Sequence, residues 1–139
     1  MRNTGRLRIL VVDDNAHARA ILSQIFSAAD IDVTPAASGP EALTILKTLR
    51  VDAVFVDMVM QPMDGIALTR AIRKLGNLEV ARLPVIMASA HTSREVVKGG
   101  LEAGVTGFVA KPFVPVAVLK RLRSALNPPA RPDANSTFL

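Results

Sequence analysis

Four short runs of consecutive apolar residues constrain this sequence more than any other feature. They lie at residues 9–12, 53–56, 84–88 and 107–110. They lack the alternation of a strand with one solvated face, so each is expected to be a strand covered on both sides. A weaker strand is expected at residues 33–36.

Stretches with helical spacing of apolar residues follow these five strands. Their apolar stripes span residues 18–25, 42–49, 66–75, 96–101 and 118–126. Asn15 is placed to cap the first helix, and Ser38 and Glu41 have the spacing of a capping box. In the third helix, Arg70, Arg73 and Lys74 are expected mostly on the solvated side.

A strand followed by a helix, five times over, predicts an α/β fold. The expected architecture is a flavodoxin-like, doubly wound parallel sheet of five strands in the order 2-1-3-4-5, with five helices. The chain of 139 residues has about the length of one domain. We expect an N-terminal extension at residues 1–6, one folded domain at 7–126 and a disordered tail at 127–139.

Composition excludes several classes of function. The absence of cysteine excludes a disulfide framework, thiol catalysis and cysteine-based metal sites. The absence of Trp and Tyr argues against an aromatic platform for single-stranded nucleic acid. The net charge of +5 is modest, so what it implies about binding partners depends on where the basic residues lie. No segment approaches the ~20 apolar residues of a membrane span, and the N-terminal apolar run is too short for a signal peptide, so a cytoplasmic location is expected.

Polar side chains stand at the ends of four strands that neighbour one another in the expected order. The first strand ends in Asp13 and Asp14, the third in Asp57, the fourth in Ser89 and the fifth in Lys111. Sites in such sheets form outside the carboxyl ends of the strands. One rim is therefore expected to gather three carboxylates, one hydroxyl and one ammonium group.

This combination favours phosphoryl chemistry. Three carboxylates repel one another, and a divalent cation with a preference for oxygen, such as Mg²⁺, relieves the repulsion. A carboxylate beside the metal can act as a nucleophile, and Lys111 and Ser89 can donate to phosphoryl oxygens. Singly, each residue has an ordinary explanation as a helix cap, a turn residue or a surface charge. Their joint placement on one rim favours a functional site over these separate explanations.

Four segments carry a family resemblance: ILVVDDN at 9–15, VFVDMVMQPMDG at 54–65, PVIMASA at 84–90 and GFVAKPF at 107–113. They resemble the receiver domain of bacterial two-component response regulators, especially stand-alone chemotaxis-type receivers, over residues 7–126.

The resemblance implies a role for each residue at the rim. Asp57 would be the phosphoacceptor, taking a phosphoryl group from a phosphohistidine on a sensor histidine kinase or a histidine phosphotransfer protein. The Mg²⁺ ligands would be Asp14 directly, Asp13 through water, Asp57 and the backbone carbonyl of Val59, and Mn²⁺ is a possible substitute. The chain would promote its own phosphorylation and dephosphorylation without being a turnover enzyme.

The resemblance also implies a switch. Lys111, joined to Pro112 by a cis peptide bond, would bind the phosphoryl group. Ser89 would be the switch hydroxyl, and Phe108 the switch aromatic whose ring turns inward after phosphorylation. The signal would pass to a downstream protein through the fourth helix, fifth strand and fifth helix of a monomeric chain, with no nucleic acid or membrane as partner.

Several residues depart from the common family pattern. Pro62 stands one place later than usual, and Val59 is apolar where many relatives have a polar side chain. Ser89 replaces threonine, and Phe108 replaces tyrosine, so the ring has no phenol group. His91 has two open interpretations: contact with the phosphoryl group, or an exposed loop histidine.

Alternatives to a phosphorylation switch remain open. The chain could be a phosphate sink or shuttle in a phosphorelay, or a receiver-like scaffold that signals without phosphorylation. Basic clusters at residues 2–8 and 120–123 could bind nucleic acid, although solvated helix charge explains them better. A flavin carrier on the same fold would need a phosphate-binding first loop and aromatic residues that sandwich the flavin, and this chain shows neither feature.

The pair Gly99–Gly100 lies inside the expected fourth helix. Each interior glycine costs about 0.5–1 kcal/mol relative to alanine, so a marginally stable, easily reshaped helix is expected. The alternative is that the pair ends the helix early and a loop runs on to Gly104.

Overall fold

The computed structural model describes residues 5–90 and 93–127. Within these residues the chain alternates strands with helices. The strands are β1 (Arg8–Val12), β2 (Asp32–Ala36), β3 (Ala53–Asp57), β4 (Val85–Ser89) and β5 (Gly107–Ala110). The helices are α1 (Ala16–Ala28), α2 (Gly39–Leu46), α3 (Gly65–Arg73), α4 (Leu78–Ala81), α5 (Arg94–Ala103) and α6 (Pro115–Leu126).

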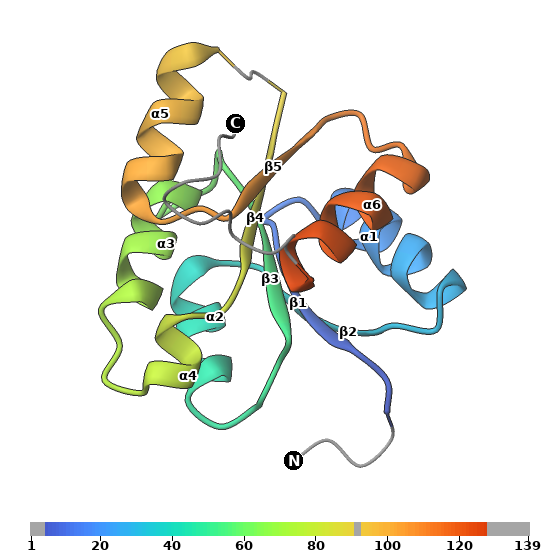
Figure 1. Ribbon diagram of the computed structural model, residues 1–139, viewed down its shortest axis with the longest axis horizontal. Coiled ribbons are helices and arrows are strands. Elements are labelled where there is room, and N and C mark those ends of the chain that lie inside the picture. Colours follow the sequence, from blue (N-terminus) through green and yellow to red (C-terminus); the bar gives the residue numbers. More distant parts are fainter. Residues whose placement is uncertain (1–4, 91–92, 128–139) are drawn as a thin grey trace, which may run out of the picture.

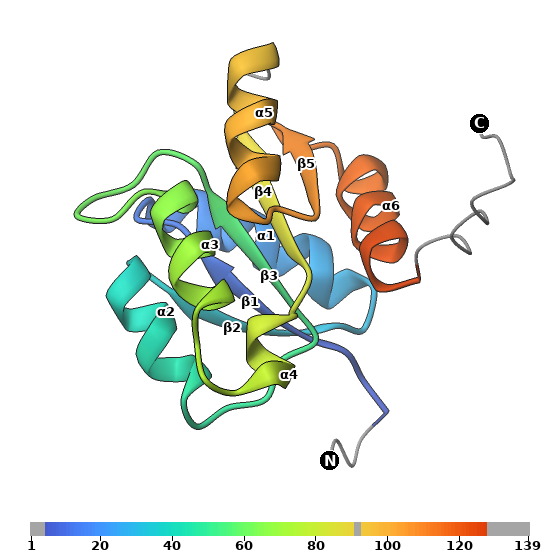
Figure 2. The ribbon, with the colours of Figure 1, turned by 60° about the vertical axis from the view of Figure 1, so that its left-hand side comes forward.

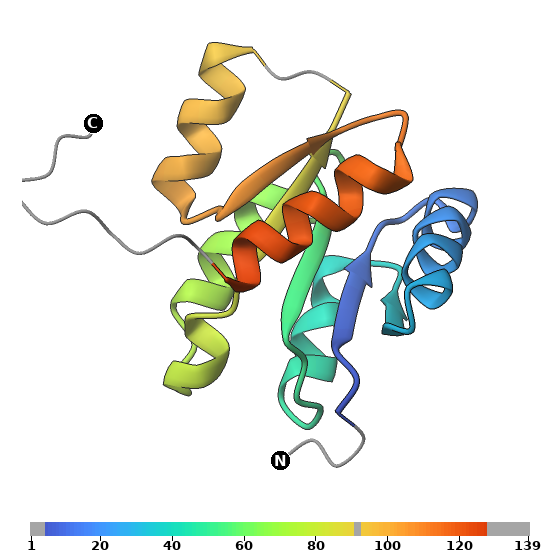
Figure 3. The ribbon, with the colours of Figure 1, turned by 45° about the vertical axis from the view of Figure 1, so that its right-hand side comes forward.

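The sheet has the predicted topology. Its strands are all parallel and lie in the order β2-β1-β3-β4-β5, so β5 is an edge strand. Helices α2, α3 and α5 cover one face, and α1 and α6 cover the other (Figures 1, 2 and 3). Continuous apolar strands fit this arrangement because both faces of each central strand are buried.

Each face of the sheet packs into its own hydrophobic cluster. On the α2–α3–α5 face, Leu68 and Ile72 are fully buried and pack with Val56 and Met87. On the α1–α6 face, Phe26 and Phe55 meet edge to face with ring centroids 4.9 Å apart. Such aromatic pairs add to the stabilisation from buried area alone. The two clusters pack the central strands on both faces, and the ends of these strands form the rim.

Six helices are present in the described part of the chain, where the sequence predicts five. The additional helix, α4, is a single turn whose capping residue Asn77 accepts hydrogen bonds from the amides of Glu79 and Val80. Only Ala81 of this helix is buried. One turn is too short to display a periodic apolar stripe, so the sequence pattern does not reveal it.

Arg73 does not lie on the solvated side of its helix as expected. It is half-buried, and its guanidinium donates to the backbone carbonyls of Gly104, Ala81 and Leu83 at 2.6–3.1 Å. Burial lowers the pKa of Arg73. The side chain thereby links α3 to the ends of α4 and α5. Arg70 and Lys74 are exposed, as predicted.

Helix α5 continues through the glycine pair, so the early end considered from the sequence is wrong. It runs to Ala103 and is capped by Gly104 in the left-handed conformation, with φ of 104°. Its N-cap is Ser93, whose hydroxyl accepts from the amide of Val96. The predicted caps Asn15 and Ser38 likewise accept from the amides of Ala18 and Glu41.

Some expectations fall on residues outside the described ranges: residues 1–4 of the N-terminal extension, His91, and residues 128–139 of the tail. Among the described residues, no helix combines the length and the apolar character needed to cross a membrane.

Candidate functional site

The rim at the carboxyl ends of the strands brings the predicted side chains together. Asp13 and Asp14 follow β1 directly, and Asp57 is the last residue of the adjacent strand β3. Ser89 ends β4, and Lys111 follows β5. Parallel neighbours end at the same edge of a sheet, so residues far apart in the sequence share one rim.

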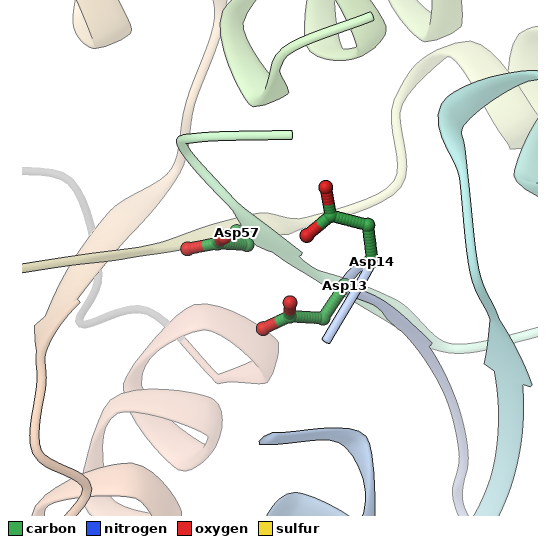
Figure 4. Close-up of side chains that lie close together, drawn as sticks. All are labelled: Asp13, Asp14 and Asp57. Atoms are coloured by element: carbon green, nitrogen blue, oxygen red, sulfur yellow. The ribbon is translucent and has the colours of Figure 1, made fainter. Parts of the chain in front are cut away.

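The three carboxylates form a compact group of oxygen atoms (Figure 4). One oxygen from each of Asp13, Asp14 and Asp57 lies within 4.8 Å of the others. Asp13 and Asp57 are buried, with 2% and 8% of their surface exposed, whereas Asp14 is exposed. This set of oxygen donors, open to solvent on one side, fits a hard divalent cation that keeps part of its water shell.

Asp13 is held in place from several directions. Its Oδ1 accepts a hydrogen bond from the amide of Asn15 at 2.9 Å, and its backbone carbonyl accepts one from Arg19 at 2.7 Å. Burial raises the pKa of Asp13 and the charge of Asp57 raises it further, whereas the Asn15 amide and Lys111 act in the opposite direction. The ionised form of this carboxyl therefore carries a desolvation cost, which a bound cation would offset.

Lys111 brings a positive charge to the carboxylates of the site. Its Nζ lies 2.8 Å from Oδ1 of Asp57 and 3.6 Å from Oδ2 of Asp13, and 5.9 Å from the centre of the Phe113 ring. Burial favours the neutral amine, but the hydrogen bond to Asp57 and the two negative charges outweigh it and raise the pKa of Lys111. The side chain is therefore charged and already directed at Asp57. The peptide bond to Pro112 is cis, as predicted.

Gly65 fixes the backbone next to Asp57, a role that the sequence reasoning missed. Its amide donates to the carbonyl of Met58 at 2.9 Å. A Cβ atom at Gly65 would lie 2.5 Å from the backbone oxygen of Asp57 and 3.0 Å from Cα of Met58. Only glycine allows α3 to begin this close to the end of β3. The available signal was a glycine directly after Asp64, which caps α3 by accepting from Ala67.

The loop from β3 to α3 also contacts the carboxylate of Asp14. The backbone amide of Gln61 donates to Oδ2 of Asp14 at 3.2 Å. The side chain of Val59 is 67% exposed. The peptide bond between Gln61 and Pro62 is also cis. Sequence reasoning singled out Val59 and Pro62 in this loop, but it gave no indication of the contact between Gln61 and Asp14.

The two residues expected to form the switch lie on the same face of the sheet. Phe108 pairs with Met87 in the parallel register, and Ser89 is two residues further along β4 than Met87. Side chains two residues apart on a strand share a face, here the one covered by α3 and α5. Ser89 is 2% exposed, and its hydroxyl lies 3.8 Å from the sulfur of Met58. Phe108 is half-buried.

Comparisons with known proteins agree with this arrangement. The family model of the response regulator receiver domain matches residues 9–123. Over 124 residues the chain is 34% identical to the DNA-binding response regulator MtrA of Mycobacterium bovis, covering 89% of this chain and 52% of MtrA. The chain thus spans about half the length of the curated relatives it matches.

Solved structures show the same fold over their whole length. Chemotaxis protein CheY4 of Vibrio cholerae superposes with a TM-score of 0.83 at 32% identity, covering 88% of this chain and 100% of CheY4. The receiver domain of a Pseudomonas aeruginosa sensor histidine kinase, which has a magnesium ion coordinated in its active-site cleft, superposes with a TM-score of 0.79 at 27% identity, covering 88% of this chain and 98% of that domain.

Proposed function

Because the chain belongs to the response regulator receiver domain family, we propose that Asp57 accepts a phosphoryl group from a phosphohistidine of a sensor histidine kinase or a histidine phosphotransfer protein. The observation that carries this proposal is the contact of 2.8 Å between Lys111 and Asp57, inside a cluster of three carboxylates. On this proposal the receiver domain spans residues 7–126.

The transfer is a displacement at phosphorus. One carboxylate oxygen of Asp57 forms a bond to phosphorus while the P–N bond to the histidine breaks, and the electron pair leaves with the imidazole. Lys111 donates a hydrogen bond to a phosphoryl oxygen, and the distance of 2.8 Å between its Nζ and Oδ1 of Asp57 supports this role.

The carboxylate cluster supports Mg²⁺ as cofactor, held by Asp13, Asp14, Asp57 and the backbone carbonyl of Val59. When bound, the ion supplies the positive charge that balances the carboxylates and the phosphoryl oxygens. Burial raises the pKa of Asp13, so its ionised form is disfavoured in the protein alone, and this supports a bound cation beside it.

The signal leaves through a change of shape. Ser89 turns toward a phosphoryl oxygen, Phe108 moves inward on the same face of the sheet, and α5 shifts with it. The expected fourth and fifth helices correspond to α5 and α6, so the surface formed by α5, β5 and α6 is the proposed contact with a downstream protein. The half-buried position of Phe108 beside β4 supports this path.

A small phosphodonor tests the proposal without a cognate kinase. Phosphoramidate carries a P–N bond, as phosphohistidine does. Incubation with Mg²⁺ should add one phosphate to the chain, measured as intact mass, and Mn²⁺ should replace Mg²⁺. Asp57→Asn, which keeps nearly the same shape, should remain unlabelled, as should wild type after metal chelation. Undiminished labelling of the Asp57→Asn variant, or no labelling of wild type, would refute the proposal.

A further inference from the structure

The two glycines of α5 have different surroundings. A Cβ atom at Gly100 would lie 2.5 Å from Cζ and 3.0 Å from Cε2 of Phe108, and 3.5 Å from a methyl carbon of Val105. A Cβ atom at Gly99 would meet only Cδ1 of Ile66, at 4.0 Å. The tip of the Phe108 ring therefore occupies the space that a side chain at Gly100 would need. We call this space the Gly100 notch.

The Gly100 notch connects the expected switch to α5 by direct contact. Phe108 and Ser89 share the sheet face that α5 covers, as the strand register requires. Gly100 is buried in that helix. Movement of the Phe108 ring along this face toward Ser89 would therefore take the ring tip out of the notch.

We propose that Gly100 is a positioning residue that holds the Phe108 ring in its resting place and so sets the balance between the resting and the phosphorylated arrangement. This inference rests on the proposed function, because it takes the ring movement from that switch. It adds that the absence of a side chain at Gly100, and not at Gly99, stabilises the resting state.

A population argument gives the direction of the effect. A phosphoryl mimic binds the switched arrangement better, so its apparent dissociation constant is the intrinsic constant divided by the fraction of switched molecules. Filling the Gly100 notch with a methyl group displaces the ring from the resting arrangement only. The switched fraction therefore rises, and the mimic binds more tightly.

Alanine substitutions at the two glycines provide the test. Gly100→Ala should lower the apparent dissociation constant for beryllofluoride at fixed Mg²⁺ by about fivefold or more, the lower end of ordinary coupling between sites. Gly99→Ala is the matched control, because it adds the same methyl group to the same helix and so carries any effect of helix propensity alone. It should change the constant much less than Gly100→Ala does. In a Phe108→Leu background, which lacks the ring tip, Gly100→Ala should lose its effect. Equal effects of the two alanines, or an effect that survives in Phe108→Leu, would overturn the proposal.

Nuclear magnetic resonance tests the notch without any phosphoryl mimic. An Overhauser contact between Hζ of Phe108 and the Hα protons of Gly100 should be present in wild type and absent in Gly100→Ala. Its absence from wild type would overturn the inference, whereas a wild type that fails to bind beryllofluoride would contradict the proposed function instead. Should Gly100→Ala fail to fold, circular dichroism of the double variant with Phe108→Leu decides: recovery of the fold supports the steric conflict, and continued unfolding overturns it.

Discussion

Replacing Gly65 with alanine should displace the backbone of the phosphoacceptor. The added Cβ would lie 2.5 Å from the backbone oxygen of Asp57, whereas ordinary contact begins at 3.4 Å, so the two must separate by about 0.9 Å. Both nearest atoms belong to the backbone of Asp57 and Met58, which cannot rotate away as a side chain would. A reacting group misplaced by about 1 Å can lose about 100-fold in rate, which is the loss we expect in labelling.

The same substitution should also reduce stability. Overpacking costs about 1–3 kcal/mol, and for a chain of this size about 4 °C of melting temperature is lost per kcal/mol. We therefore expect Gly65→Ala to melt about 4–12 °C lower than wild type.

The assay compares the initial rate of labelling by phosphoramidate at saturating Mg²⁺, below the melting temperature of every variant. Gly76→Ala is the control, because nothing lies within 4 Å of a Cβ atom there. A Gly65→Ala protein with the stability and labelling rate of wild type would refute the steric reasoning.

Four further predictions address the carboxylates, Lys111 and α5. Asp13→Asn should raise the free energy of unfolding at neutral pH without metal, because a carboxyl with a raised pKa stabilises the fold below its ordinary pKa of 3.8 and loses this stabilisation as pH rises through its folded-state pKa. Denaturation in chelator at several pH values should show a gain in stability that disappears toward pH 3.8. A gain in stability that is the same at every pH would contradict this. Asp14→Ala should weaken Mg²⁺ binding in calorimetry more than Asp13→Ala, and the reverse order would count against Asp14 as the direct ligand. Lys111→Ala should still be labelled, but amide exchange in α5 should no longer respond, and a normal response would remove Lys111 from the switch. Amides of residues 93–104 should exchange faster than those of the other helices and slow with beryllofluoride; slow, unresponsive exchange would refute the marginal stability of α5.

The strand positions, and the gathering of acidic side chains at one rim, could be predicted because both depend on local pattern and on sheet geometry. Strands buried on both faces must be apolar throughout, so β1, β3 and β4 are visible as continuous runs. Once the strand order is known, the parallel arrangement alone predicts that Asp13 and Asp57 lie at the same rim.

Contacts between elements could not be predicted in the same way. The place of Arg73 among three backbone carbonyls depends on where α4 and α5 end, which the pattern within α3 does not reveal. The two glycines of α5 are equivalent in the sequence, yet only Gly100 faces Phe108. The need for glycine at position 65 likewise becomes clear only from the close approach of α3 to the end of β3.

Chemical reduction of the phosphorylated protein tests the central claim most directly. Borohydride reduces an acyl phosphate to an alcohol, so a phosphorylated aspartate becomes homoserine and is marked permanently at its position in the chain. After treatment with phosphoramidate and Mg²⁺, peptide mass spectrometry should find homoserine at position 57 and at no other aspartate, and none when the metal is chelated. Homoserine at position 13 or 14, or its absence from a protein that has gained a phosphate, would contradict the assignment of Asp57 as the phosphoacceptor.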